Sequence, residues 1–101
     1  MPREAIAKTN FKNRLAKEVF FEFYAPQAKK VGLGGTFNGW DASKCNLSKQ
    51  FNGKWTVTLK LQSGRYEYRY WVDGNWENDQ RSTIKCVPNA FGTWNCVLEI
   101  S

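Results

Sequence analysis

Hydrophobic and polar positions alternate along much of this chain, in the way that β-strands require. In residues 55–61 every second position is apolar, and in residues 65–72 tyrosines recur at every second position. Because successive side chains of a strand point to opposite faces of a sheet, each run has one core face and one solvent face. We therefore predict two strands here. The side chains expected to pack in the core are Trp55, Tyr66, Tyr68 and Tyr70.

Further runs extend this pattern over most of the chain. Residues 18–24 are β-branched and aromatic and stop before a proline, a short strand begins over 29–33, and residues 94–100 alternate again. Residues 77–92 are expected to be irregular, and no segment has helical periodicity. Six or seven short strands separated by turns predict an all-β fold, an immunoglobulin-like antiparallel β-sandwich.

Two of the predicted turns each place a tryptophan at the edge of a sheet. Residues 34–44 are rich in glycine and asparagine, so we predict a loop that carries Trp40. Asp73-Gly74 favours a two-residue hairpin, after which Trp76 begins the returning strand. Arg69 lies on the strand before this hairpin, on the face opposite the tyrosines, so we expect Trp76 to be close to it.

The composition fits a single small domain with aromatic rings left over at its surface. The chain has 101 residues, and its five Trp, four Tyr and seven Phe exceed what so small a core easily hides. Exposed aromatic side chains usually bind something. A large enclosed active-site cavity is not expected in a chain of this length.

The net charge of +6 is concentrated near the N-terminus. Residues 1–30 hold seven Lys or Arg against three Glu, so the aromatic part of the chain is nearly balanced. Nucleic-acid grooves interleave cations with stacking rings, which disfavours a nucleic-acid partner. We predict a flexible basic N-terminal arm over residues 1–16 and a folded domain over residues 17–101.

Several function classes lack the residues that they need. The chain has no His and three Cys without C-x-x-C spacing, so we expect no metal, no cofactor and reduced thiols in a cytoplasmic protein. Its N-terminus lacks the apolar segment of a signal peptide, and no run is long enough to cross a membrane. Hydrolysis of glycosides needs two carboxyl groups beside one bond, and the acidic positions are explained by turns and exposed strands. We therefore expect no catalysis.

Tryptophan with nearby hydrogen-bonding side chains suits sugar binding, because a glucose ring has a face of C–H bonds and a rim of hydroxyl groups. Trp40 and Trp76 have no periodic reason to be buried, although aromatic loop residues often fold back over the end of a sandwich. From the pattern alone, Asn38 and Asn95 fit a structural role, as turn-forming or backbone-capping residues, as well as they fit sugar binding.

Three ordered motifs resemble carbohydrate-binding modules of family 48. They are Val31-Gly-Leu-Gly-Gly-Thr-Phe-Asn-Gly-Trp40-Asp, the stretch from Gly64 to Asp79, and Val87-Pro-Asn-Ala-Phe-Gly-Thr-Trp-Asn95. These early-set domains occur N-terminally in isoamylases and glycogen branching enzymes and in the β subunit of AMP-activated protein kinase. The resemblance covers about residues 17–100 and is strongest to free-standing bacterial early-set proteins.

The resemblance implies a binding site for α-1,4-glucan such as glycogen or starch. Trp40 and Trp76 match the two rings that stack on the sugar, and Arg69 matches a basic donor. Phe91 stands where the kinase subunit has a leucine. The implied carbohydrate-binding residues are Trp40, Arg69, Trp76, Phe91, Thr93 and Asn95.

The expected function is therefore non-catalytic glucan binding that targets or regulates glycogen metabolism, and a glycogen-metabolising enzyme is the protein partner that this function suggests. The alternative is a protein-interaction module associated with a glycoside hydrolase or a branching enzyme. In that case the same aromatic surface, or an exposed strand edge, would dock a protein. Phe91 is bulkier than the leucine that it replaces, and the roles of Trp71 and Trp94 stay open at this point.

Overall fold

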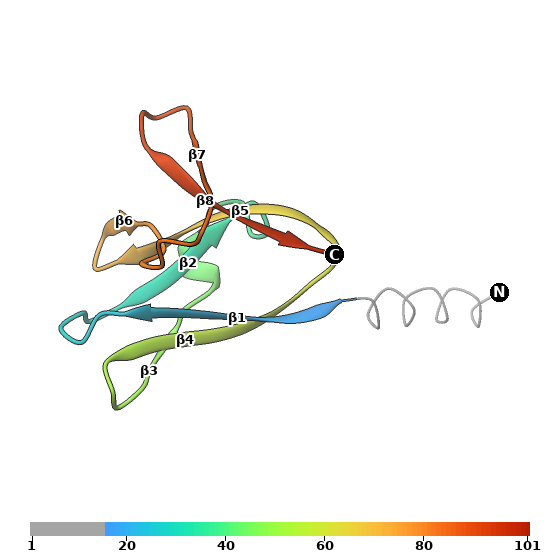
Figure 1. Cartoon of the computed structure of the whole chain (residues 1–101). Coiled ribbons are helices and arrows are strands. Elements are labelled where there is room, and N and C mark those ends of the chain that lie inside the picture. Colours follow the sequence, from blue (N-terminus) through green and yellow to red (C-terminus); the bar gives the residue numbers. More distant parts are fainter. Residues whose placement is uncertain (1–15) are drawn as a thin grey trace, which may run out of the picture.

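A computed structural model of the chain describes residues 16–101, which form eight strands and one short 3-10 helix (Figure 1). The elements run, in chain order, β1 (Lys17–Tyr24), β2 (Val31–Gly35), η1 (Ala42–Lys44), β3 (Ser48–Lys49), β4 (Lys54–Leu61), β5 (Gly64–Val72), β6 (Asn75–Glu77), β7 (Cys86–Pro88) and β8 (Trp94–Ile100). Residues 1–15, which make up nearly all of the predicted N-terminal arm, lie outside the described part.

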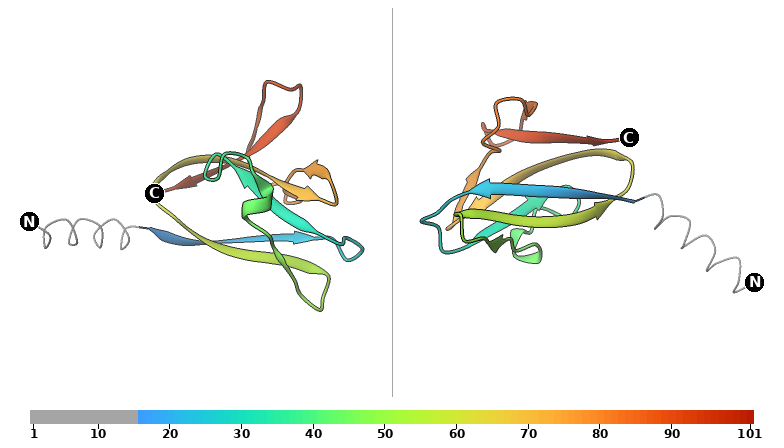
Figure 2. Two further views of the ribbon diagram at one scale, coloured as in Figure 1. Left: turned by 180° about the vertical axis from the view of Figure 1, so that it is seen from behind. Right: turned by 60° about the horizontal axis from the view of Figure 1, so that its bottom comes forward.

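The strands form two antiparallel sheets that face each other, as the views from two further sides show (Figure 2). One sheet has the order β1-β4-β3. The other has the order β2-β5-β8-β7, and β6 pairs with β5 beyond the point where β8 leaves it. The predicted immunoglobulin-like β-sandwich is thereby confirmed.

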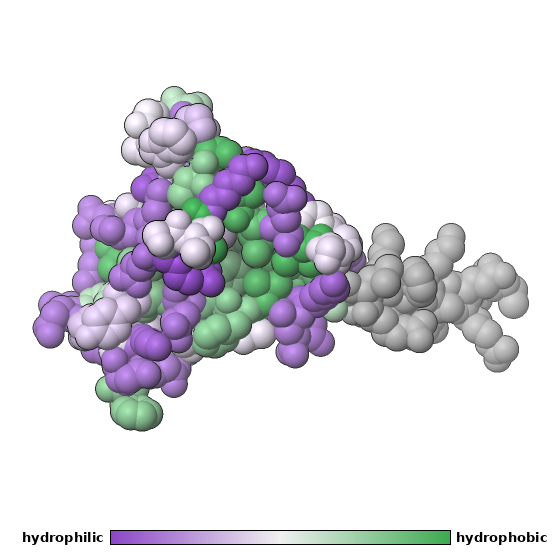
Figure 3. All heavy atoms as spheres, viewed as in Figure 1, coloured by the Kyte–Doolittle hydropathy of each residue, from purple (hydrophilic) through white to green (hydrophobic). Residues whose placement is uncertain are grey.

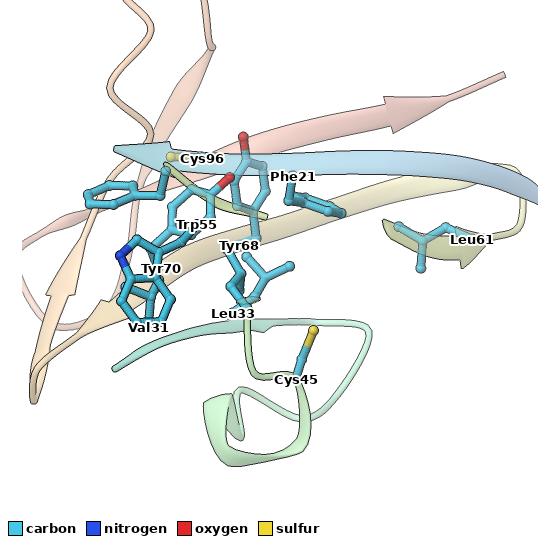
Figure 4. Close-up of a cluster of buried hydrophobic side chains, with 11 residues drawn as sticks. Phe21, Val31, Leu33, Cys45, Trp55, Leu61, Tyr68, Tyr70 and Cys96 are labelled. Atoms are coloured by element: carbon cyan, nitrogen blue, oxygen red, sulfur yellow. The ribbon is translucent and has the colours of Figure 1, made fainter. Parts of the chain in front are cut away.

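The core lies between the two layers and is rich in aromatic side chains (Figure 4). Tyr68 and Tyr70 from β5 are almost fully buried and meet Phe21 and Phe23 from β1, with ring centroids 5.4 Å and 4.8 Å apart. The alternation in the sequence predicted this face correctly. On the face that Figure 3 shows, hydrophobic residues lie in the middle of the domain and hydrophilic residues surround them.

The prediction of a loop over residues 34–44 was partly wrong, because β2 continues to Gly35. Gly34 pairs with Arg69 and Gly35 with Tyr68 in the ladder to β5. Glycine inside a strand often marks a place where another group approaches the backbone closely. A β-carbon on Gly35 would lie 2.6 Å from the Phe37 ring, so these glycines serve packing as well as turning.

The prediction that residues 77–92 are irregular was partly wrong, because this segment contains β7, which pairs with β8. The two strands form a hairpin that projects beyond the two layers (Figures 1 and 2). At the other turn, the prediction for Asp73-Gly74 is confirmed: both residues have positive φ, 47° and 91°. Trp71 and Trp76 therefore face each other across β5 and β6.

Candidate functional site

Three tryptophan rings lie together where β5, β6 and the loop after β2 meet. The ring of Trp76 stands edge-on to Trp71, at 4.9 Å between centroids and 70° between planes. It is also edge-on to Trp40, at 6.0 Å and 80°. Such perpendicular arrangements favour aromatic pairs through their quadrupoles. Trp76 is thus fixed between its two neighbours, and all three rings are partly exposed.

The backbone around these rings is shaped to hold them. Trp40 has a φ of 64°, a left-handed conformation that bulky side chains rarely adopt, and its N–H donates to the Gly35 carbonyl at 2.9 Å. Asn38 stabilises this turn, accepting from Gly35 N–H at 3.0 Å and donating to the Leu33 carbonyl at 2.9 Å. Both hydrogen bonds of the Asn38 side chain go to backbone groups of β2, so the structure gives this residue the turn-forming and backbone-capping role.

Gly34 lies directly beneath the Trp76 ring. A β-carbon at this position would come within 2.6 Å of Trp76 Cη2 and 2.9 Å of Cζ3. A β-carbon does not come this close to a non-bonded ring carbon, so the absence of a side chain is what lets the ring rest on the β2 backbone. The position of Trp76 therefore depends on a residue in the neighbouring strand.

The guanidinium group of Arg69 links β5 to the two segments on either side of the site. Its Nε donates to Asn78 Oδ1 at 2.5 Å, and its two terminal nitrogens reach Thr93 Oγ1 and the Trp76 carbonyl, each at 3.4 Å. The first bond is short and the other two are long and weak. Arg69 is therefore oriented by the protein and keeps donor capacity for a further acceptor.

The β7–β8 hairpin is organised by Asn89, a residue that the sequence analysis did not single out. Its Oδ1 accepts from Phe91 N–H at 2.9 Å and Thr93 N–H at 3.1 Å. Its Nδ2 donates to Thr93 Oγ1 at 2.7 Å and Asn95 Oδ1 at 2.9 Å. One amide thus sets the positions of three predicted site residues.

Asn95 is held from its other side by Glu67. Asn95 Nδ2 donates to Glu67 Oε1 at 3.0 Å, and Arg65 forms an ion pair with the same carboxylate at 2.7 Å. These two hydrogen bonds, that of Asn95 first, hold the pKa of the Glu67 carboxyl below its ordinary value. Glu67 is therefore an ionised acceptor at neutral pH.

All six predicted site residues line one open groove of about 810 Å³, a volume within the usual range for small-molecule sites. Their exposure differs widely: Phe91 at the hairpin tip is 91% exposed, whereas Asn95 is 8% exposed at the base of the groove. The remaining lining residues are Glu67, Asn89 and Ala90. Glu67 is the single carboxylate among the described residues that line this groove, so no paired carboxyl groups are present there.

A smaller cavity of about 300 Å³ lies on the other side of the tryptophan cluster. Trp71 lines this cavity and does not line the main groove, and its ring packs on Trp76 rather than beneath Trp40. Trp94 is 53% exposed and lies outside both cavities. The two aromatic residues that the motifs left unexplained therefore lie outside the groove that unites the six.

Within residues 16–101, no group of three or more Cys, Asp or Glu side chains is arranged to hold a metal ion. In the same part of the chain, no helix is long and apolar enough to span a membrane.

Comparison with known proteins assigns this chain to a family. Residues 18–101 match the family model for the glycogen recognition site of AMP-activated protein kinase. The chain belongs to this family. The motifs around Trp40, Trp76 and Asn95 that resembled family-48 modules all lie inside the matched part of this glycogen-recognition domain.

Relatives of the glycogen-recognition domain occur in animals and plants. It is 35% identical over 72 residues to 5'-AMP-activated protein kinase subunit beta-1 of Homo sapiens, covering 71% of this chain and 25% of that protein. It is 40% identical over 74 residues to Protein PTST homolog 2, chloroplastic, of Arabidopsis thaliana, covering 73% of this chain and 13% of that protein. The chain thus spans a quarter or less of the length of these relatives.

A solved structure confirms the fold assignment independently. The maltogenic amylase from S. marinus superposes with a TM-score of 0.65 and 27% identity, over 83% of this chain and 13% of the amylase chain. The glycogen-recognition domain therefore shares its sandwich with a segment of a much larger enzyme.

Proposed function

We propose that this domain binds α-1,4-glucan chains in the open groove, without changing them. The observation that carries the proposal is the convergence of Trp40, Trp76, Arg69 and the β7–β8 hairpin on one groove in a chain of the glycogen-recognition family. Flat rings beside fixed hydrogen-bonding groups are what a glucose unit requires.

Each side of the groove has a separate role in this mechanism. Trp40 and Trp76 stack on the C–H faces of neighbouring glucose units, and their perpendicular planes suit the curve of an α-1,4 chain. Arg69 donates to sugar hydroxyl groups from the groove wall. Thr93 and Asn95 offer the hydroxyl and amide groups of the hairpin, and Phe91 covers the bound chain from the hairpin tip.

Binding without hydrolysis is the activity that this groove supports. Cleavage of a glycosidic bond by the usual route needs a second carboxyl group across the sugar, and Glu67 already accepts hydrogen bonds from Asn95 and Arg65. A shallow groove gives modest affinity for one chain, so retention depends on the many chain ends of one particle. The domain thereby brings an associated glycogen-metabolising enzyme of the cytoplasm to its polysaccharide.

The test is a calorimetric titration of the full chain with maltoheptaose and β-cyclodextrin. We expect the native protein to bind both ligands and the Trp40→Ala and Trp76→Ala variants to lose at least about tenfold in affinity, or roughly 1.4 kcal/mol. Trp94→Ala is the matched control, because this tryptophan is exposed but lies outside the groove.

Two results would contradict the proposal. A folded native protein that binds neither ligand would leave the protein-interaction alternative as the better account of the aromatic surface. Equal losses in Trp94→Ala and the two groove variants would place the sugar elsewhere.

A further inference from the structure

Two cysteines face each other at the base of the β7–β8 hairpin. Cys86 is the register partner of Cys96, and in the adjacent pair Val97 N–H donates to the Lys85 carbonyl at 2.8 Å. Hydrogen-bonded and non-hydrogen-bonded pairs alternate along an antiparallel ladder, so Cys86 and Cys96 form a non-hydrogen-bonded pair. Cα atoms in such pairs are about 4.5 Å apart, which is within the range that a disulfide spans.

The two thiols differ in their access to solvent. Cys86 is partly exposed, whereas Cys96 is fully buried and its sulfur accepts the Asp79 N–H at 3.2 Å. Burial raises the pKa of Cys96 to about 11, and the neighbouring Cys86 thiol adds to this rise. An attacking reagent therefore meets Cys86 first, and Cys96 is placed to react with whatever Cys86 carries.

We propose that Cys86 and Cys96 form a thiol-oxidation site, at which a low-molecular-weight disulfide such as oxidised glutathione converts them to a cross-strand disulfide. The Cys86 thiolate attacks one glutathione sulfur, which forms a mixed disulfide and releases one glutathione thiolate. The Cys96 thiolate then attacks the Cys86 sulfur and releases the second. Two protein thiols are oxidised, one glutathione disulfide is reduced, and the two protons end on the two glutathione thiols.

The new bond closes the loop 86–96, which carries the hairpin side of the groove. β8 is also paired with β5, whereas β7 is an outermost strand of three residues that pairs with β8 through a short ladder. A covalent link there restricts opening of the segment that Asn89 organises. This regulatory role rests on the proposed glucan-binding function, and a better-ordered hairpin binds more tightly because less order is lost on binding.

The first experiment tests whether the bond forms. The full chain is incubated with oxidised glutathione, and its intact mass and peptide map are recorded. We expect the loss of two hydrogen atoms and a peptide that links Cys86 to Cys96. The Cys45→Ser variant should behave identically, and Cys86→Ser should form no internal bond. A stable glutathione adduct on Cys86, a linked dimer or a bond to Cys45 would overturn the inference.

The second experiment tests whether the bond orders the hairpin. Phe91 and Phe51 both lie in exposed turns of hairpins, and chymotrypsin cleaves after phenylalanine. Oxidation should slow cleavage after Phe91 about fivefold and leave cleavage after Phe51 unchanged as the internal control, while maltoheptaose affinity rises roughly two- to fivefold. Unchanged cleavage after Phe91 would overturn the regulatory role.

The two proposals fail in different ways. If neither the reduced nor the oxidised protein binds maltoheptaose, the glucan-binding function fails, whereas the bond and its effect on cleavage after Phe91 stand. If glucan binds equally well in both states, the glucan site stands and regulation of that site by oxidation fails.

Discussion

The Trp76 ring can pack against β2 because Gly34 has no side chain. Two ring atoms lie within 2.9 Å of the position that a β-carbon of this residue would take, so Gly34→Ala forces the ring outward. The displaced atoms belong to the far end of a partly exposed side chain, so the fold survives. We predict a loss of maltoheptaose affinity of about 5- to 30-fold, which corresponds to roughly 1–2 kcal/mol, measured by calorimetry.

A double-mutant cycle shows whether this loss acts through the ring. In a Trp76→Ala background, Gly34→Ala should cost nothing further, because the clashing atoms are gone. An undiminished second loss would mean that Gly34 influences the groove by another route, such as the nearby Trp40 carbonyl, which lies 3.3 Å from the same β-carbon position.

Loss of the hydroxyl group should change the free energy of unfolding differently at two neighbouring core tyrosines. Tyr68 donates to Asp79 Oδ2 at 2.8 Å, whereas the buried hydroxyl of Tyr70 has no hydrogen-bond partner. Tyr68→Phe should lower the free energy of unfolding by about 1.5–3 kcal/mol, and Tyr70→Phe should leave it unchanged or raise it by up to about 1 kcal/mol. Urea unfolding of the two variants decides this, and equal destabilisation would contradict it.

At the level of single residues, the sequence supports some roles and conceals others. The six groove residues were predictable because motif resemblance placed them in order. The role of Gly34 was not, since glycine suits a turn and a close approach equally well, and the partner ring is 42 positions away in the chain. Asn89 lies in no periodic pattern, and alternation places Glu67 only on the solvent face of its strand; the importance of both residues follows from hydrogen bonds to residues on other strands or turns.

Among the elements, the β7–β8 hairpin depends most on one side chain. Asn89→Ala removes the four hydrogen bonds that position Phe91, Thr93 and Asn95. Most of these bonds are solvent-exposed, so we predict little change in overall stability and a loss of glucan affinity of about tenfold.

A second hairpin supplies the control for this variant. Asn52 in the β3–β4 turn also caps its own turn, accepting from Lys54 N–H at 3.1 Å, and it lies away from the groove. Asn52→Ala should therefore leave maltoheptaose binding unchanged. Native affinity in Asn89→Ala would show that Phe91, Thr93 and Asn95 do not need this amide to be positioned.

Element length explains which strands could be predicted. β1, β4, β5 and β8 each have at least seven residues, enough for alternation to be visible in the sequence. β3 has two residues and β7 has three. Both are strands only because they pair with a longer neighbouring strand, so no local sequence pattern predicts them. The start of β6 was predictable because the Asp73-Gly74 turn fixes it.

Over the whole molecule, Asp79 joins the loop after β6 to the core of the sandwich. It accepts from Tyr68 on β5 and from the Arg81 side chain at 2.9 Å and 3.0 Å. Burial disfavours its ionised form, but the hydrogen bonds from Arg81 and Tyr68 outweigh burial and hold the pKa of this carboxyl below its ordinary 3.8. Folding therefore favours the ionised carboxylate.

This shift predicts how stability depends on pH. A carboxyl whose pKa is lower in the folded state stabilises the protein above its ordinary value of 3.8, and that contribution falls as pH drops toward the folded-state value. In urea unfolding, Asp79→Asn should be clearly less stable than the native protein at pH 7, and the gap should narrow below about pH 4. Arg81→Ala should show the same narrowing, and a gap that stays constant with pH would contradict this account.

The tryptophan cluster also gives the molecule an optical signature. Three indole groups held nearly perpendicular at 4.9 Å and 6.0 Å have coupled electronic transitions, which appear in circular dichroism as a paired positive and negative band. Any ligand that lifts the Trp76 ring away from its neighbours changes that spectrum without an attached dye. The domain therefore carries a built-in reporter of what happens in its groove.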